Sequence, residues 1–388
     1  SSLKIIAEFG PMHILIAPNA FKNSLDAAAA AEHIREGLLL SRLKPSTTCF
    51  PVGDGGDGTA ELLIAHLKGE TRIVETTDAL GRKISSSFGW IGDQRLAVIE
   101  MADASGLRQL KPEEYNPLRA TTYGTGRVLK AALDLSPKKI IMGIGGSATV
   151  DGATGILQAL GLRFLDKDGN ELSGLPESLS SLHAIDSAAL DKRILETEFI
   201  ILCDVDNILL GDEGAAAVFG PQKGATPEMV KTLDAALARF SDIALRQTGF
   251  DMSLVRHGGA AGGTAAGLRA FAGAILANGI DQFLEITQFD KALEQADLVI
   301  TAEGSIDRQT LNGKAPYGVA KKAKEKNIPV IGLAGKIPLD TDPELDRYFD
   351  ALIAIGHQPL TLEAAMGLTA ANLQRTAVMI GNVLAIKK

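Results

Sequence analysis

The chain opens and closes with short apolar runs that alternate with segments of helical spacing. An apolar run at 13–20 is followed by a helix-like segment at 25–40, with a candidate cap at Ser24, and by a second apolar run at 47–52. The C-terminal part returns to the same order, and its predicted strands are 298–304, 328–335 and 351–356. This alternation of strands and helices predicts parallel sheets covered by helices, as in Rossmann-like α/β domains.

The middle of the chain has a different pattern. Alternating or short apolar runs, broken by glycine and acidic residues, predict strands at 72–80, 83–91 and 95–102. Two further apolar runs predict strands at 138–146 and 199–205. The middle therefore belongs to a separate α/β region.

These patterns predict a chain of two domains. Residues 12–68 plus 288–388 are interpreted as one discontinuous Rossmann-like domain, and residues 69–287 as a second α/β domain inserted into it. Residues 1–11 are interpreted as an expression remnant ahead of a natural start at Met12.

The overall charge and the cysteines narrow the range of partners. A formal net charge of −8 lacks the concentrated positive field that nucleic acids and anionic membranes require, although it allows small anionic ligands. No apolar run approaches the roughly 20 residues of a membrane span. Cys49 and Cys203 both fall in predicted strands, which is typical of reduced thiols. The sequence therefore predicts a cytoplasmic protein that binds a small molecule, with no nucleic-acid or membrane partner.

Glycine-rich segments interrupt the chain at 53–58, 143–155, 258–267 and 303–314. Glycine permits the left-handed turns and the close backbone approach that a phosphate site needs. The segment at 143–155 follows a predicted strand and precedes a predicted helix, which is where backbone N–H groups can hold phosphate. We therefore interpret this segment as a candidate phosphate-binding turn.

Asp151 lies inside that candidate turn. Its carboxylate would repel a phosphate unless a cation lay between them. Mg²⁺ is commonly bound by one or two carboxylates together with nucleotide phosphates, so Asp151 is assigned to a magnesium–phosphate site. The alternative is that Asp151 caps the following helix.

The same turn supports a rival function. Its sequence GIGGSA, at 143–148, matches the G-x-G-x-x-G/A fingerprint of dinucleotide-binding proteins, and Asp166 and Asp168 follow further along the chain. An NAD(P)-dependent dehydrogenase is therefore one alternative. A non-enzymatic protein that binds phosphorylated metabolites is another.

Several ordered segments resemble the bacterial glycerate kinase family, which is distinct from the P-loop kinases. They are IAPNAFKNSL, PVGDGGDGT, TTYGTG, GIGGSATVDGATGILQALG, CDVDNILLGDEGAAAVFGPQKGA, GGAAGGTAAGL and ITAEGSIDRQTLNGKAPYGVA. The resemblance extends over nearly the whole chain from Met12. It implies ATP-dependent phosphorylation of D-glycerate with Mg²⁺, with 2-phosphoglycerate favoured and the 3-phosphate left open. It also implies a Rossmann-like domain, a second α/β domain and an active site in the cleft between them.

The chain departs from the family's pattern at two places. Gly152–Ala153 replaces the usual glycine pair. Asp206–Asn207–Ile208 stands where the family usually has Thr-Asn-Pro, which adds a negative charge near a predicted strand end.

Charge type and these motifs together assign roles to individual residues. The expected nucleotide-binding residues are Thr122, Thr125, Gly145, Gly146, Ser147 and Thr149. The expected magnesium ligands are Asp151 and Asp204. The expected catalytic residues are Lys22, Asp204 and Asp307, and the expected substrate-binding residues are Asp54, Lys223, Glu303 and Lys314. A homodimer is a candidate assembly.

Overall fold

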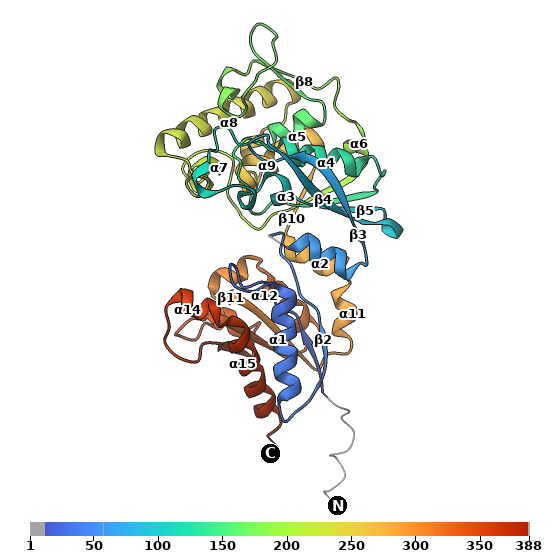
Figure 1. Cartoon of the computed structure of the whole chain (residues 1–388), viewed down its shortest axis with the longest axis vertical. Coiled ribbons are helices and arrows are strands. Elements are labelled where there is room, and N and C mark those ends of the chain that lie inside the picture. The colour runs from blue at the N-terminus through green and yellow to red at the C-terminus, as the bar shows by residue number, and fades with distance from the viewer. Residues whose placement is uncertain (1–11, 57, 387–388) are drawn as a thin grey trace, which may run out of the picture. The chain divides into compact units, whose positions relative to one another are not determined.

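The computed structural model describes residues 12–56 and 58–386, and these form two compact units. The first unit runs up to Asp54 and resumes at Ile280, and the second comprises Gly55–Gly279 (Figure 1). The sequence had suggested divisions after 68 and after 287, so both observed divisions fall earlier in the chain. The segment at 1–11 and Asp57 lie outside the described residues.

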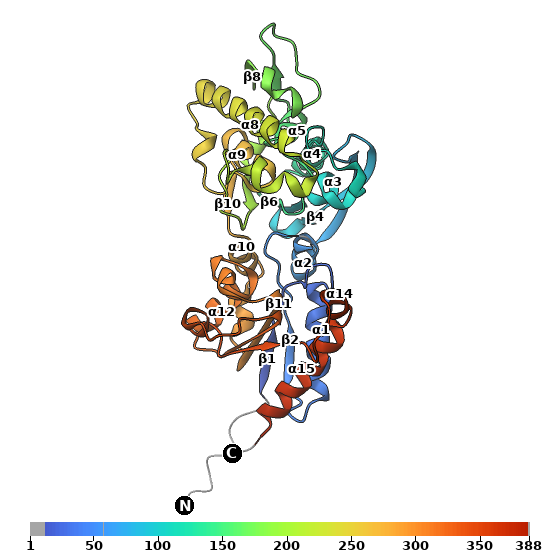
Figure 2. The same ribbon diagram turned by 90° about the vertical axis from the view of Figure 1, so that its left-hand side faces the viewer.

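The first unit contains a five-stranded sheet in which every strand is parallel to its neighbours. In sheet order, the strands are β13 (Ala351–Ala354), β12 (Val330–Lys336), β11 (Leu298–Ser305), β1 (His13–Ile16) and β2 (Ser46–Cys49). The helices are α1 (Ala27–Leu40), α10 (Gly279–Ile286, which begins at the unit boundary), α11 (Phe289–Leu293), α12 (Ala315–Glu325), α13 (Pro343–Asp346), α14 (Leu362–Gly367) and α15 (Thr369–Leu384). Figure 2 shows α12 on one face of this sheet and α1 with α15 on the other. The predicted Rossmann-like arrangement is confirmed for this unit.

Helix α1 begins and packs through specific local contacts. The carboxylate of Asp26 accepts a hydrogen bond from the N–H of Ala29 at 2.7 Å, so the helix is capped by Asp26. The expected cap at Ser24 is wrong, because that hydroxyl donates to a backbone carbonyl outside α1. Along the helix, a Cβ at Gly37 would lie 2.2 Å from the carbonyl oxygen of Gln374 in α15. Glycine therefore allows the two helices to touch.

The second unit contains a six-stranded sheet and a separate two-stranded sheet. In sheet order, the six strands are β10 (Ile275–Ala277), β9 (Glu198–Leu202), β6 (Lys139–Gly143), β5 (Leu96–Glu100), β4 (Lys83–Ile91) and β3 (Glu70–Thr77). The two-stranded sheet pairs β7 (Arg163–Leu165) with β8 (Ala184–Asp186). The helices are α2 (Thr59–His66), α3 (Ala102–Ser105), α4 (Tyr123–Leu133), α5 (Thr154–Ala159), α6 (Arg193–Glu196), α7 (Ala215–Phe219), α8 (Pro227–Thr248) and α9 (Ala260–Ala272).

The six-stranded sheet is parallel from β10 to β5 and antiparallel from β5 to β3. Helix α2 packs on β4 and β5 of this sheet, and a Cβ at Gly89 would lie 2.4 Å from the side chain of Ile64. This packing explains why α2 belongs to the second unit, although the sequence pattern had grouped it with the first.

The glycine-rich segment at 258–267 contains the start of α9. Three successive residues at 261–263 have positive φ, which places a left-handed turn inside the helix. A Cβ at Gly267 would lie 1.9 Å from the carbonyl oxygen of Gly152. The glycines of this segment therefore let α9 approach the segment around Gly152, which is a packing role.

The α/β class predicted from the sequence is confirmed by both units. Among the described residues, no helix combines the length and apolar character needed to cross a membrane.

Candidate active site

In the first unit, three polar side chains meet at the carboxyl edge of the parallel sheet. Asn19 follows β1, Glu303 lies near the end of β11, and Asp54 ends the first stretch of the unit. The amide of Asn19 donates to Asp54 Oδ2 at 3.0 Å and to Glu303 Oε1 at 3.4 Å. Ligands of open α/β sheets bind at this edge, so the three residues form a candidate binding site.

The carboxyl group of Glu303 lacks the donors that a buried carboxylate ordinarily has. The residue is 9% exposed, and its Oε2 is enclosed without a hydrogen-bond partner among the described residues. Burial, together with the nearby charge of Asp54, raises the pKa of Glu303 to about 7, although Lys314 and Lys22 act in the opposite direction. A pKa near neutrality makes this carboxyl group able to take up or release a proton under physiological conditions.

Two predicted lysines belong to the surroundings of this cluster. Lys22 is exposed, and Lys314 immediately precedes α12 and is half-buried. Both act electrostatically on Glu303. They therefore bring positive charge to the same edge of the sheet as the three polar side chains.

Asp307 has a local structural contact. Its carboxylate accepts a hydrogen bond from the N–H of Gln309 at 2.9 Å and caps the short 3₁₀ helix Arg308–Asn312. Its backbone N–H in turn donates a hydrogen bond to the hydroxyl oxygen of Thr310 at 3.0 Å. Asp307 thus shapes the turn that leads from Glu303 to Lys314.

In the second unit, the predicted phosphate-binding turn follows β6 directly. Gly145 is half-buried, while Gly146 is exposed and has a φ of +68°. Among the hydrogen bonds of the described residues, none is donated by the N–H of either glycine. A Cβ at Gly145 would lie 3.1 Å from the Cα of Gly56, so a second glycine-rich segment lies against this turn. The turn therefore offers backbone donors at a glycine-lined surface.

Asp151 is enclosed in the second unit, with no exposed surface. Its Oδ2 accepts hydrogen bonds from the N–H of Thr122 at 2.8 Å, from the Thr122 hydroxyl at 2.9 Å and from the N–H of Gly155 at 3.2 Å. Its Oδ1 accepts one from the N–H of Ala153 at 3.1 Å. Burial raises its pKa. This geometry favours the capping alternative, because the lone pairs that would bind Mg²⁺ already hold the start of α5.

Three other predicted nucleotide-binding residues have side chains that are buried inside the second unit. Thr122 and Thr149 have no exposed surface, and Thr125 is 1% exposed. Thr125 donates to the hydroxyl of Ser105 at 2.8 Å, and the Thr149 hydroxyl is enclosed without a partner among the described residues. The side chains of these threonines are therefore part of the interior of the second unit.

Lys223 reaches the same turn from the short 3₁₀ helix Pro221–Lys223. Its Nζ donates to the hydroxyl of Ser147 and to the carbonyl oxygen of Thr149, both at 2.7 Å. The side chain is 2% exposed, and burial lowers its pKa to about 7. In this structure Lys223 braces the turn, whereas the sequence had suggested contact with the substrate.

Asp204 follows β9 at the carboxyl edge of the second sheet and is exposed. Asp206, the residue that departs from the family's pattern, pairs with Arg256 at 3.1 Å and lies 3.3 Å from Nδ1 of His257. Its extra negative charge is therefore balanced locally.

Across the described residues, no cluster of three or more His, Cys, Asp or Glu side chains could hold a metal by itself.

Two buried polar residues at these sheet edges were missed from the sequence. Asn19 was present in a quoted motif, but only the structure shows its amide joining two carboxylates. Glu100 ends β5, is 5% exposed and accepts a hydrogen bond from the N–H of Gly58 at 2.9 Å. The signal for Glu100 was an acidic residue at the end of an apolar strand.

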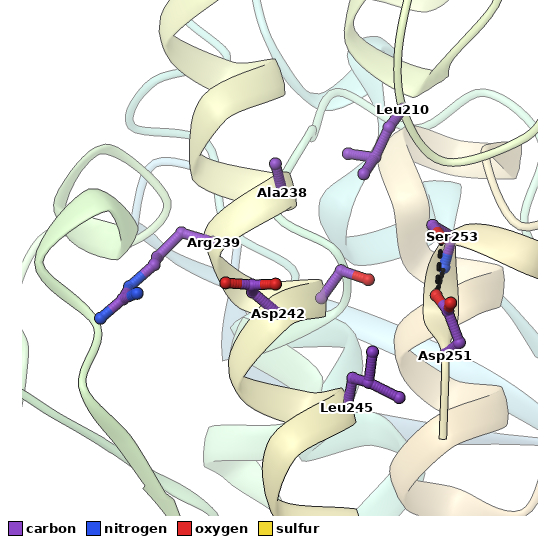
Figure 3. Close-up of a pocket in the computed structure, with 8 residues that line it drawn as sticks. Leu210, Ala238, Arg239, Asp242, Leu245, Asp251 and Ser253 are labelled. Carbon is purple, nitrogen blue, oxygen red and sulfur yellow. Dashed lines mark hydrogen bonds between the residues drawn. The ribbon is translucent and has the colours of Figure 1, made fainter. Parts of the chain in front are cut away.

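A surface pocket of the second unit lies elsewhere. It is lined by residues of α8 together with Leu210, Asp251 and Ser253, and Figure 3 shows Asp251 hydrogen-bonded to Ser253. None of the predicted site residues lines it. The pocket is therefore separate from the residues considered for chemistry.

The dehydrogenase alternative does not fit the local structure. Helix α5 begins at Thr154, well after the GIGGSA turn, and the carboxylate of Asp151 occupies its N-terminal N–H groups. Asp166 accepts hydrogen bonds from the N–H groups of Asp168 and Asn170, within its own turn. Neither the helix N-terminus nor the acidic residues are arranged as in a dinucleotide site.

Comparison with known proteins identifies the class. The model of the glycerate kinase family matches residues 14–385. Glycerate kinase of Bacillus subtilis (strain 168) is 45% identical over 94% of this chain and 96% of its own, and glycerate 2-kinase of Escherichia coli (strain K12) is 40% identical over 97% and 98%. A crystal structure from Salmonella typhimurium LT2, assigned provisionally to glycerate kinase 2, matches with a TM-score of 0.84 and 43% identity over 97% of this chain and 98% of that one. The chain belongs to the glycerate kinase family.

Proposed function

We propose that this protein transfers the γ-phosphoryl group of ATP to the 2-hydroxyl group of D-glycerate. Membership of the glycerate kinase family supports ATP as the phosphoryl donor, and the relative described as a glycerate 2-kinase supports the 2-position. The observation that carries the proposal is the cluster of Asn19, Asp54 and Glu303, with Lys22 and Lys314 acting on it.

The chemistry of this cluster matches a small hydroxy acid. Glycerate has one carboxylate, which requires a cation, and two hydroxyl groups, which require hydrogen-bond acceptors. Lys22 and Lys314 supply positive charge, while Asp54 and Glu303 supply acceptors. We assign the glycerate site to these side chains in the first unit. Asp307 acts there by holding the turn before Lys314.

We assign the nucleotide phosphates to the turn after β6 in the second unit. The N–H groups of Gly145 and Gly146 are the donors, because neither has an intramolecular partner among the described residues. Ser147 and Lys223 hold the turn in shape through their hydrogen bond. Thr122, Thr125 and Thr149 have a structural role in this unit, since their side chains are buried.

The donor set of the second unit fits a magnesium ion that arrives with the nucleotide. Mg²⁺ in kinases uses one or two protein carboxylates and completes its coordination with phosphate oxygens and water. The exposed carboxylate of Asp204, rather than the enclosed one of Asp151, would hold it. When bound, the ion neutralises charge on the phosphates during transfer.

The proposal also covers the compartment and the assembly of the protein. We place the protein in the cytoplasm, since both of its cysteines are free thiols and its substrate ATP is intracellular. A homodimer is the proposed assembly, and light scattering of the purified protein decides it.

A product assay tests the function. Purified protein is incubated with ATP, Mg²⁺ and D-glycerate, and the mixture is followed by ³¹P NMR. We expect ADP together with a phosphomonoester signal that proton coupling splits into a doublet, as required for the 2-phosphate. A triplet would move the product to the 3-phosphate. Folded protein that forms no ester would refute the kinase assignment, and a reaction without glycerate controls for ATP hydrolysis.

A further inference from the structure

Glu303 is a buried acid whose carboxyl group has fewer hydrogen bonds than a buried carboxyl group normally has. Its Oε1 has a single long bond from Asn19 at 3.4 Å, and its Oε2 is enclosed without a partner among the described residues. Buried polar groups are almost always paired, so an unpaired carboxylate oxygen indicates that a donor from a ligand belongs there.

Asn19 orients the acceptors that such a ligand would meet. Asn19 is 7% exposed and holds both Asp54 and Glu303 through one amide, which fixes the direction of the two carboxylates. A hydroxyl group next to Glu303 therefore meets an oriented acceptor.

We propose that Glu303 is the general base of the transfer, with Asn19 as a positioning residue. This inference rests on the proposed function. The hydroxyl oxygen of glycerate attacks the γ-phosphorus and forms the new O–P bond, and its proton passes to the free carboxylate oxygen of Glu303. The bond from the γ-phosphorus to the bridging oxygen breaks, and its electron pair leaves with ADP.

The electrostatics of the cluster suit a base that works near neutral pH. A general base is most effective when its pKa lies near the working pH. Burial and the charge of Asp54 raise the pKa of Glu303 to about 7, and Lys314 and Lys22 oppose this rise. The base is therefore active when deprotonated, and turnover should increase with pH through the region around 7.

The first test compares Glu303→Gln with the wild type and with Glu325→Gln, an exposed carboxylate on α12 of the same unit. We expect E303Q to lower kcat by about 10²- to 10⁴-fold, with a much smaller change in the binding of D-glycerate measured by calorimetry. E325Q should match the wild type. Retained glycerate binding shows that E303Q is folded. An E303Q variant within threefold of wild-type kcat overturns the inference.

The second test uses the pH profile of kcat/KM, which a merely structural role would not move. Asp54→Asn removes a charge that raises the pKa of Glu303, so the ascending limb should shift to lower pH. Lys314→Met removes a charge that lowers this pKa, so the limb should shift to higher pH. The pH of the ascending limb can be measured even when either variant has lower activity than the wild type. Shifts in the same direction, or no shift in either variant, overturn the inference.

The proposed function and the role of Glu303 are refuted by different results. If the wild type forms no phosphoglycerate, the proposed function is wrong. If the wild type forms it and E303Q retains kcat, the function stands and only the role of Glu303 is wrong.

Discussion

Glu303 should make the folded protein less stable as the pH rises, so replacing it should stabilise the protein at alkaline pH. Its pKa is raised from 4.5 to about 7 in the folded state, mainly because burial disfavours the charged form. Between these two values the folded chain binds more protons than the unfolded chain. The contribution of Glu303 to stability is therefore fully present below 4.5 and is lost as the pH rises through about 7.

The size of this effect follows from the two pKa values. The interval from 4.5 to about 7, at about 1.4 kcal/mol for each pKa unit, corresponds to about 3 kcal/mol. Glutamine has nearly the same shape and carries no charge, so E303Q should not lose this stability as the pH rises. The free energy of unfolding of E303Q relative to the wild type should grow by about 2 to 3 kcal/mol between pH 5 and pH 8.5.

Urea unfolding at the two pH values measures this difference. Far-UV circular dichroism follows the whole chain, while the single tryptophan, Trp90 in β4, follows the second unit. The charge change lies in the first unit, and the exposed Glu325→Gln variant controls for loss of a carboxylate. A stability difference between E303Q and the wild type that is equal at both pH values would contradict the raised pKa.

Further predictions concern packing, the enclosed acid and the metal. Gly37→Ala should lower the stability of the first unit by about 2 kcal/mol in urea unfolding, because the new Cβ would lie 2.2 Å from a carbonyl oxygen of α15; Gly356→Ala, which meets open space, should change it by less than about 0.5 kcal/mol. Asp151→Ala should lower the urea midpoint reported by Trp90 by the equivalent of about 3 kcal/mol or more, because the buried donors around the carboxylate would lose their acceptor. An unchanged midpoint would show that Asp151 does not stabilise the fold. Asp204→Asn should lower kcat/KM by about 100-fold in a coupled ADP assay with Mg²⁺, and turnover near that of the wild type would remove Asp204 from the chemistry.

The local part of the fold could be predicted from short stretches of sequence. The apolar runs that became β1, β11 and β12 are short, continuous and bounded by turn residues, which is the pattern of strands buried on both faces. The carboxyl ends of such strands face one edge of the sheet, so Asp54 and Glu303 could be named as candidates. Their meeting through Asn19 could not, because it joins residues 284 positions apart.

The roles of the glycine-rich segments could not be distinguished from the sequence. A glycine required for a phosphate turn and a glycine required for close packing have the same appearance in a sequence. Gly146 is exposed with a positive φ, whereas Gly267 is needed because a Cβ there would lie 1.9 Å from the carbonyl oxygen of Gly152. Only the packing of α9 against that segment separates the two cases.

The amino-acid sequence alone determined the α/β class, the order of strands and helices, and the family, because periodicity and ordered motifs are local properties of the chain. The tertiary structure decided which polar side chains are available for chemistry. Asp151 and Lys223 looked like ligands beside a glycine turn, yet both are enclosed: Asp151 holds the start of α5, and Lys223 holds the turn. Glu303 is also buried, but one oxygen of its carboxyl group has no hydrogen-bond partner among the residues that the structure describes. Burial and the direction of a side chain depend on contacts between segments distant in sequence, and no local pattern contains them.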